Sequence, residues 1–224
     1  FEGRDLQQTI HLTDDSVESI NELLQNHHPT KIILSSVIKH REGLEAQLGA
    51  AAKFHMLGHA SKLPITTPVG KPETIGADRL AICSAAVDLF GGQHNLAIGL
   101  GTCITYNFTN KYHEFLGGSI SPGMNMRFRA MHEQTALLPL IEAQNQFPLV
   151  GYDTKTNLLS GVILGMAKEI DGIIEAYAEK YSNFNVLLTG GDMPYFVPHL
   201  KNRIFADPNL IFKGLYAISE FNNG

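Results

Sequence analysis

The sequence has no tryptophan, only two cysteines and no excess of positive charge. Its 17 lysines and arginines are outnumbered by 22 aspartates and glutamates, and the net charge of -5 leaves no basic surface for a nucleic acid backbone. Cys83 and Cys103 each stand among apolar residues, which is typical of a reducing compartment and excludes a disulfide scaffold. No apolar stretch reaches the roughly 20 residues of a membrane-spanning helix, and residues 1–8 lack the pattern of a signal peptide. We therefore expect a soluble cytoplasmic protein without a nucleic acid or membrane partner.

The sequence does contain enough apolar residues for a substantial core. Hydrophobic residues make up 44% of the 224, which suits one large or two small globular domains. Over the first quarter of the chain, β-rich and helical segments alternate, with strands expected at 9–12, 31–37 and 53–57 and helices at 17–24 and 41–52. This order, with its short connections, predicts a parallel sheet covered by helices.

The chain changes character beyond a loop at 61–74 that contains three prolines. A helix is expected at 77–90, and glycine turns then separate the short strands of a β-meander. The remaining expected elements are strands at 96–98, 102–108, 112–116 and 186–189, and helices ending near 135 and spanning 157–181 and 210–221. We expect two α/β halves, an N-terminal one over 1–85 and a C-terminal one over 86–224.

Three clusters of glycine are expected to close strands. They are Gly99 to Thr102, Gly117 to Gly123, and Gly190 with Gly191. Backbone amides in tight turns and at helix N-termini can bind phosphate, so three such clusters in one small protein suggest a nucleotide. Turn formation alone also explains glycine after a strand. The spacing matches neither the Walker loop nor the dinucleotide fingerprint, so hairpin turns would have to hold the phosphates.

Asp78 and Arg79 begin the helix that follows the proline-rich loop. Here a carboxylate can take a proton from a substrate hydroxyl while a guanidinium holds a substrate anion. The alternative is an aspartate that caps the helix and an arginine that is solvated. His55 and His59 lie across a strand end, where a spacing of four does not place both on one face, so no metal site is predicted. Both cysteines are interpreted as packing residues.

Five motifs that occur in a fixed order give the chain a family resemblance. They are GADR at 76–79, GTCIT at 101–105, GGSISPG at 117–123, T-x-x-x-x-x-S-G at 154–161 and TGGD at 189–192. Together they resemble type III pantothenate kinase, the first enzyme of coenzyme A synthesis. The resemblance covers the chain from about Lys31 onward. It implies an α/β fold of two related ribonuclease H-like halves, as in actin, Hsp70 and the sugar kinases, with ATP in the cleft between them.

The resemblance also implies a reaction and a set of residues. The reaction is ATP-dependent phosphorylation of pantothenate to 4'-phosphopantothenate, with Mg²⁺ bridging the phosphates and Asp78 as the general base. The residues implied to bind pantothenate are Gly76, Ala77, Asp78, Arg79 and, across a homodimer interface, Thr154. Those implied to bind ATP are Gly101, Thr102, Gly118, Gly190 and Gly191.

The chain departs from the family pattern in three places. Val69 replaces a tyrosine of the family, so one wall of the substrate pocket differs while the GADR match is unaffected. The family opens with a strand and the phosphate-gripping motif D-x-G-N-T-x-x-K, which does not occur in residues 1–224. We therefore expect an N-terminal half that is short by a strand and its phosphate loop, and weak phosphotransfer by the chain as written. Gly99 replaces the family's aspartate for a monovalent cation, which puts a need for K⁺ or NH₄⁺ in doubt. A non-catalytic accessory or regulatory relative is the alternative function, and another sugar-kinase-like enzyme is a third.

Overall fold

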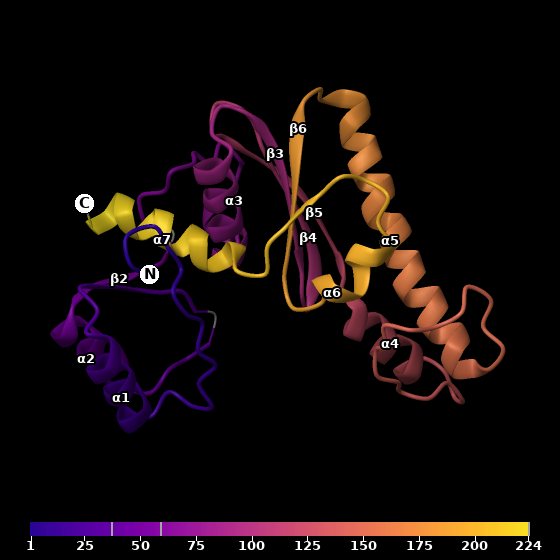
Figure 1. Cartoon of the computed structure of the whole chain (residues 1–224), viewed down its shortest axis with the longest axis horizontal. Coiled ribbons are helices and arrows are strands. Elements are labelled where there is room, and N and C mark those ends of the chain that lie inside the picture. The colour runs from indigo at the N-terminus through magenta and orange to yellow at the C-terminus, as the bar shows by residue number, and fades with distance from the viewer. Residues whose placement is uncertain (37, 59, 224) are drawn as a thin grey trace.

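The protein, seen as a computed structural model, is a mixed α/β structure built around two sheets (Figure 1). The structure describes residues 1–36, 38–58 and 60–223. A five-stranded sheet has the strand order β5-β4-β3-β6-β7, and a separate pair, β1 with β2, is parallel. Within the described residues, none of the helices is both long and apolar enough to cross a bilayer.

The five-stranded sheet combines a meander with a parallel extension. Strands β3 (His94–Leu100), β4 (Cys103–Thr109) and β5 (Phe115–Pro122) are antiparallel neighbours, as the glycine turns predict. Strands β6 (Phe184–Thr189) and β7 (Phe205–Ala206) then add in parallel to the other side of β3. Parallel strands need a long crossover connection, and the long helix that precedes β6 supplies it.

Helices cover both faces of this sheet (Figure 1). On one face α4 (Met124–Glu133), α5 (Thr154–Lys180) and α6 (Met193–Phe196) enclose the largest core cluster, with η2 (Val197–His199) following α6. On the other face α3 (Ala77–Leu89) packs with α7 (Leu210–Asn223). Alternate strand residues therefore face opposite helices: Leu96 and Ile98 face α5, whereas Ala97 faces α3.

The N-terminal part of the chain forms a smaller layered unit. Helices α1 (Val17–His27) and α2 (Leu44–Ala51) pack against one face of β1 (Lys31–Leu34) and β2 (Lys53–Met56). The opposite face packs against α7 and the start of α3, and a 3₁₀ turn, η1 (Pro72–Thr74), precedes α3. From residue 17 onward the predicted order of helix, strand, helix and strand is confirmed here, as is the parallel pairing of the two strands. The predicted boundary between residues 85 and 86, which falls inside α3, stays a prediction.

Two sequence-based expectations are wrong. Residues 9–12 form no strand, because no other described strand lies beside them to supply backbone hydrogen bonds. The third strand of the meander is not confined to 112–116 but runs from Phe115 to Pro122, so Gly117 and Gly118 lie inside it. Gly99 likewise lies within β3, whereas Gly101, Gly123 and Gly190 each directly follow a strand. Val37, at the end of one expected strand, lies outside the described residues.

A buried carboxylate on α5 fastens the segment that leads into β7. Burial alone would raise the pKa of Asp171, but hydrogen bonds from Asn202 and from the backbone N–H of Lys201 more than offset this and lower that pKa. The folded form therefore binds the proton less tightly than the unfolded chain, and the stability that this carboxylate contributes is present above about pH 4.

Asp171→Asn is expected to lower the free energy of unfolding at pH 7 by about 2 kcal/mol, because it removes a buried charged acceptor from the N–H groups of Lys201 and Asn202. The difference from the parent should shrink as the pH falls below 4 through the lowered pKa, where Asp171 itself becomes protonated. Urea unfolding at several pH values measures both effects. Lys168→Ala is the control, since this exposed lysine lies 4.0 Å from Asp171 and contributes little. A constant difference between pH 7 and pH 2 would contradict the interpretation.

Candidate active site

Three of the predicted glycine positions converge at one end of the five-stranded sheet. Gly101 and Thr102 form the exposed turn between β3 and β4, and the N–H of Gly123 donates to the Thr102 carbonyl at 3.1 Å. A Cβ on Gly123 would overlap the carbonyl oxygens of Gly101 and Thr102, so only glycine allows this approach. Since α4 begins at the next residue, the helix N-terminus lies directly beside the turn.

The turn after β6 joins the same place. Gly190 has a φ of +109°, and a Cβ there would overlap the carbonyl oxygen of Leu100. The residues after Gly190 also contact the end of β3, because the N–H of Asp192 donates to the Leu100 carbonyl at 3.3 Å. The structure therefore brings Gly101, Thr102 and Gly190 together although they are far apart in the sequence.

A cavity of about 440 Å³ opens beside these turns. Its lining includes Asp192, one residue beyond Gly191, and Asn125, two residues beyond Gly123. Burial raises the pKa of Asp192 above its ordinary value. The complete lining is Met124, Asn125, Phe128, Arg129, Leu140, Ile141, Glu142, Ala143, Asp192 and Tyr195. Aromatic, amide and carboxylate side chains around a space of this size suit a heterocycle with hydroxyl groups.

The motif GADR forms the first turn of α3 on the other face of the sheet. Gly76 is the N-cap residue, and no side chain caps this helix end. Asp78 is exposed and accepts no hydrogen bond from any described residue, so the capping alternative for Asp78 is wrong. An exposed carboxylate at a helix N-terminus is free to meet a substrate.

Arg79 is not a solvated side chain either. Its Nε donates to Oδ1 of Asn107 at 2.6 Å, and its guanidinium lies 5.4 Å from the ring centre of Phe115. Asn107 is fully buried and donates its Nδ2 to the carbonyl of Ala97 at 3.0 Å. Arg79 therefore lies over β4 at Asn107, and Gly118 is the residue of the neighbouring strand β5 that pairs with Asn107.

Thr154 does not join these residues within one chain. It is exposed at the first position of α5, where Asp153 and Thr156 form a capping box. Figure 1 shows this end of α5 beside α4, and α3 lies on the opposite face of the sheet. Thr154 of the same chain is therefore remote from Asp78.

Similarity to known proteins follows the same motifs. The family described as Type III pantothenate kinase matches residues 2–176. The chain belongs to that family. A type III pantothenate kinase of Cytophaga hutchinsonii is 40% identical over 222 residues, which are 99% of this chain and 93% of the relative. One of Bacteroides fragilis is 38% identical over 225 residues, which are 100% of this chain and 93% of the relative.

A solved structure confirms the fold class. A Campylobacter jejuni protein, named as a member of the Baf family of transcriptional activators, has a TM-score of 0.59. It is 22% identical, and the match covers 91% of this chain and 88% of that chain. The predicted α/β fold and the resemblance to type III pantothenate kinase are thus both confirmed. None of these similarities favours the non-catalytic alternative.

Sequence reasoning missed two polar groups that shape this site. Asn107 gives no signal, because a single amide inside a β-rich run is also compatible with an edge position. Arg127 pairs with Glu169 and donates to Ser121 and Pro122, while the Tyr106 hydroxyl donates to Glu169 at 3.2 Å. This network ties α4 to α5, and the burial of Tyr106 and the Glu169 charge raise the pKa of that tyrosine.

Proposed function

We propose that this type III pantothenate kinase family member phosphorylates the primary hydroxyl of pantothenate with ATP, yielding 4'-phosphopantothenate for coenzyme A synthesis. Family membership over most of the chain supports the reaction. The observation that carries the proposal to these residues is the convergence of Gly101, Thr102 and Gly190 beside the N-terminus of α4. Backbone amides at such turns and helix ends bind phosphate without a dedicated side chain.

Each part of the site then has a role. Thr102 and the backbone amides of Gly101, Gly190 and Gly191 stabilise the phosphates, whereas Gly118 lies within β5, paired with Asn107, and not beside these turns. The adjacent 440 Å³ cavity receives the nucleoside. Arg79 holds the pantothenate carboxylate beside Gly76 and Ala77, and Asp78 accepts the hydroxyl proton as the oxygen attacks the γ-phosphorus.

Mg²⁺ is proposed to enter with the nucleotide. Within residues 1–36, 38–58 and 60–223 there is no group of three or more His, Cys, Asp or Glu side chains that could hold a metal ion, and His59 lies outside these residues. Mg²⁺ in kinases is commonly held by phosphates and one or two carboxylates, a role that Asp192 fits. When bound, the ion would neutralise charge on the phosphates.

The decisive experiment measures ADP release by the complete protein as its host encodes it. We expect ATP consumption that depends on pantothenate and yields a product with one added phosphoryl group. Glucose and other sugars replace pantothenate in parallel reactions. Pantothenate-independent turnover, or transfer to a sugar in its place, would overturn the proposal.

Binding of the pantothenate carboxylate should depend on how Asn107 orients Arg79. Asn107→Leu is expected to raise the KM for pantothenate about tenfold with a smaller change in kcat, because the Nε of Arg79 loses its acceptor while the reacting groups stay in place. Arg79→Lys, which keeps the charge but loses the fixed plane, should give a similar increase. An unchanged KM in both variants would contradict a role for Arg79 in substrate binding.

Gly99 supplies no carboxylate for a monovalent cation site of the family kind. A Cβ on Gly99 would lie 2.9 Å from Oγ1 of Thr105 and 3.1 Å from Cδ1 of Ile82, so a carboxylate side chain would fit there only if these two side chains shifted. We expect turnover rates in Na⁺, K⁺ and NH₄⁺ salts to agree within about twofold at equal ionic strength. Activation of tenfold or more by K⁺ alone would refute this.

We further propose a homodimer, which would supply Thr154 from the partner subunit. Large apolar side chains are exposed just before Thr154 in the sequence, namely Leu149, Val150 and Tyr152, each with more than three quarters of its surface accessible. Such a patch next to a remote substrate residue favours a second copy of the chain as its partner. Light scattering should give a mass of two chains, and a single-chain mass at assay concentrations would contradict this. A cytoplasmic location follows from the same metabolic role.

A further inference from the structure

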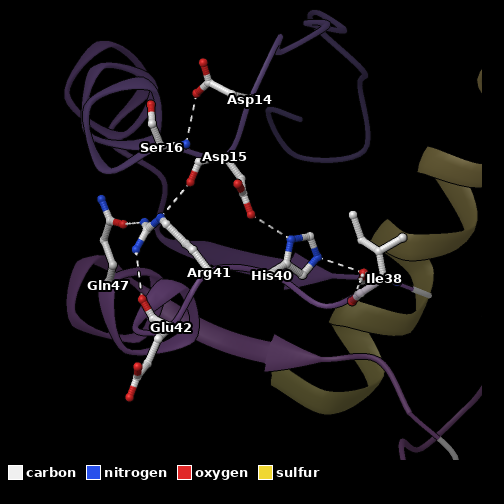
Figure 2. A network of polar contacts seen from close by, with 9 residues as sticks. Asp14, Asp15, Ser16, Ile38, His40, Arg41, Glu42 and Gln47 are labelled. Carbon is white, nitrogen blue, oxygen red and sulfur yellow. Dashed lines mark hydrogen bonds and ion pairs between the residues drawn. The ribbon is translucent and has the colours of Figure 1, made fainter.

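A serine, a histidine and an aspartate form a continuous hydrogen-bonded chain outside the kinase site. The Nε2 of His40 lies 2.7 Å from Oγ of Ser36, and its Nδ1 lies 3.0 Å from Oδ2 of Asp15. Figure 2 shows the His40 ring between Asp15 on one side and the turn at Ile38 on the other. The three residues come from separate places in the sequence, since Asp15 precedes α1 and the other two follow β1.

The order of contacts is the one that activates a serine. With a proton on Nδ1 donated to Asp15, Nε2 of His40 is left as the acceptor for the Ser36 hydroxyl. The hydrogen bond from His40 lowers the pKa of Asp15, so this carboxylate stays ionised and can stabilise a positive imidazolium. Hydroxyl, base and orienting carboxylate are thus all within hydrogen-bonding distance.

Neighbouring groups hold this arrangement in place. Arg41 donates from Nε to the Asp15 carbonyl at 2.6 Å and also contacts Gln47 on α2 (Figure 2). Asp14 accepts from the N–H of Ser16 at 2.9 Å, which fixes the start of α1 next to Asp15. The aspartate is therefore positioned from both sides by residues that do not take part in the relay.

The site is also accessible. The His40 side chain is 20% exposed, and neighbouring Ile38 is 70% exposed and offers an apolar surface. Ser36 follows the carboxyl end of a parallel strand, where α/β proteins commonly place reactive groups. None of the three residues belongs to the phosphate turns or to the GADR motif.

We propose that Ser36, His40 and Asp15 form a second reactive site that accepts an acyl group from activated esters or thioesters. Oγ of Ser36 attacks the carbonyl carbon while its proton passes to Nε2 of His40. The bond to the alkoxide or thiolate breaks, and that leaving group takes the proton from His40. Water, deprotonated by His40, then attacks the acyl-serine, releases the carboxylic acid and restores Ser36.

The chain offers a matched control for this proposal. Ser61 lies 2.8 Å from Nε2 of His55 and accepts from the N–H of Gly58 at 3.0 Å, much as Ser36 accepts from the N–H of Ile38 at 3.1 Å. No carboxylate among the described residues contacts the His55 ring. A serine–histidine contact alone is therefore present at Ser61, and the complete relay is present at Ser36.

The test treats the complete protein with p-nitrophenyl acetate and locates the acetyl group by peptide mass spectrometry. We expect acetylation at Ser36 and p-nitrophenolate release about 100-fold faster than in Ser36→Ala, with comparable losses in His40→Gln and Asp15→Asn. Ser61→Ala should react like the parent. Circular dichroism and melting temperature establish that each variant is folded.

Each of the remaining outcomes would overturn the proposal. These are acetylation at other residues only, an equal rate in Ser36→Ala, or an adduct at Ser36 whose rate is unaffected by His40→Gln. A structural clamp between the segment before α1 and the loop after β1 would change the melting temperature without any acyl adduct. ADP release with pantothenate is measured on the same samples, so failure of the kinase function is seen separately.

Discussion

Replacing Asp78 with asparagine is expected to lower kcat for pantothenate phosphorylation by about 100- to 10,000-fold, with little change in the Kd of either substrate. Asparagine matches the size of the aspartate but cannot accept the hydroxyl proton at neutral pH. Because Asp78 accepts no hydrogen bond from any described residue and does not cap α3, the helix should be undisturbed. Steady-state kinetics and calorimetric binding of pantothenate measure the two quantities.

Asp88→Asn is the matched control for this variant. Asp88 is an exposed carboxylate on the same helix, near its opposite end, and it pairs with Arg4. Removing its charge should change kcat by less than about twofold, since surface ion pairs contribute little. If Asp78→Asn turned over as fast as the parent while still binding pantothenate, the base would have to be another group.

The second large effect is expected at the turn after β6. Gly190→Ala should lower the free energy of unfolding by about 3 kcal/mol, because alanine is strained at a φ of +109° and its Cβ overlaps the Leu100 carbonyl oxygen. Relief of the overlap must move the turn away from β3, which also separates it from Thr102. We therefore expect the folded Gly190→Ala protein to have a KM for ATP that is about tenfold or more above that of the parent.

Gly191→Ala separates local strain from the mere addition of a methyl group. Gly191 has no atom within 4 Å of an added Cβ and no positive φ, so its free energy of unfolding should change by less than about 0.5 kcal/mol. Denaturant unfolding of both variants makes the comparison. Equal stability of the two would show that the close approach at Gly190 is not needed by the fold.

The sequence predicted those parts of the site whose chemistry is local. Gly190 with Gly191 and the Gly101–Thr102 turn could be identified because glycine between a strand and the next element signals a close backbone approach. The helix that starts at Ala77 and the parallel pair β1–β2 were predictable from apolar periodicity. The assignment of Asp78 as the base stays a prediction, which its exposed position supports.

What could not be predicted depends on contacts between distant segments. Asn107 is indistinguishable from an edge residue until the pairing of β4 with β3 and β5 shows that it faces Arg79. The strand at 115–122 was predicted to end early, because Gly117 and Gly118 suggest a turn when the strand is considered alone. Its actual length is set by β4, against whose Tyr106 carbonyl only a glycine at 118 can pack.

The position of α7 has a consequence for synthesis of the protein. The apolar face of Ile33 and Leu57 in the N-terminal unit packs against Ile218, and Gly214 crosses α3 so closely that a Cβ would overlap the Ala81 carbonyl oxygen. Ile33 and Leu57 are therefore covered by α7 only after more than 150 further residues have been made. During translation these apolar residues of the N-terminal unit therefore stay uncovered until α7 has been made, and chaperones can bind them in that interval.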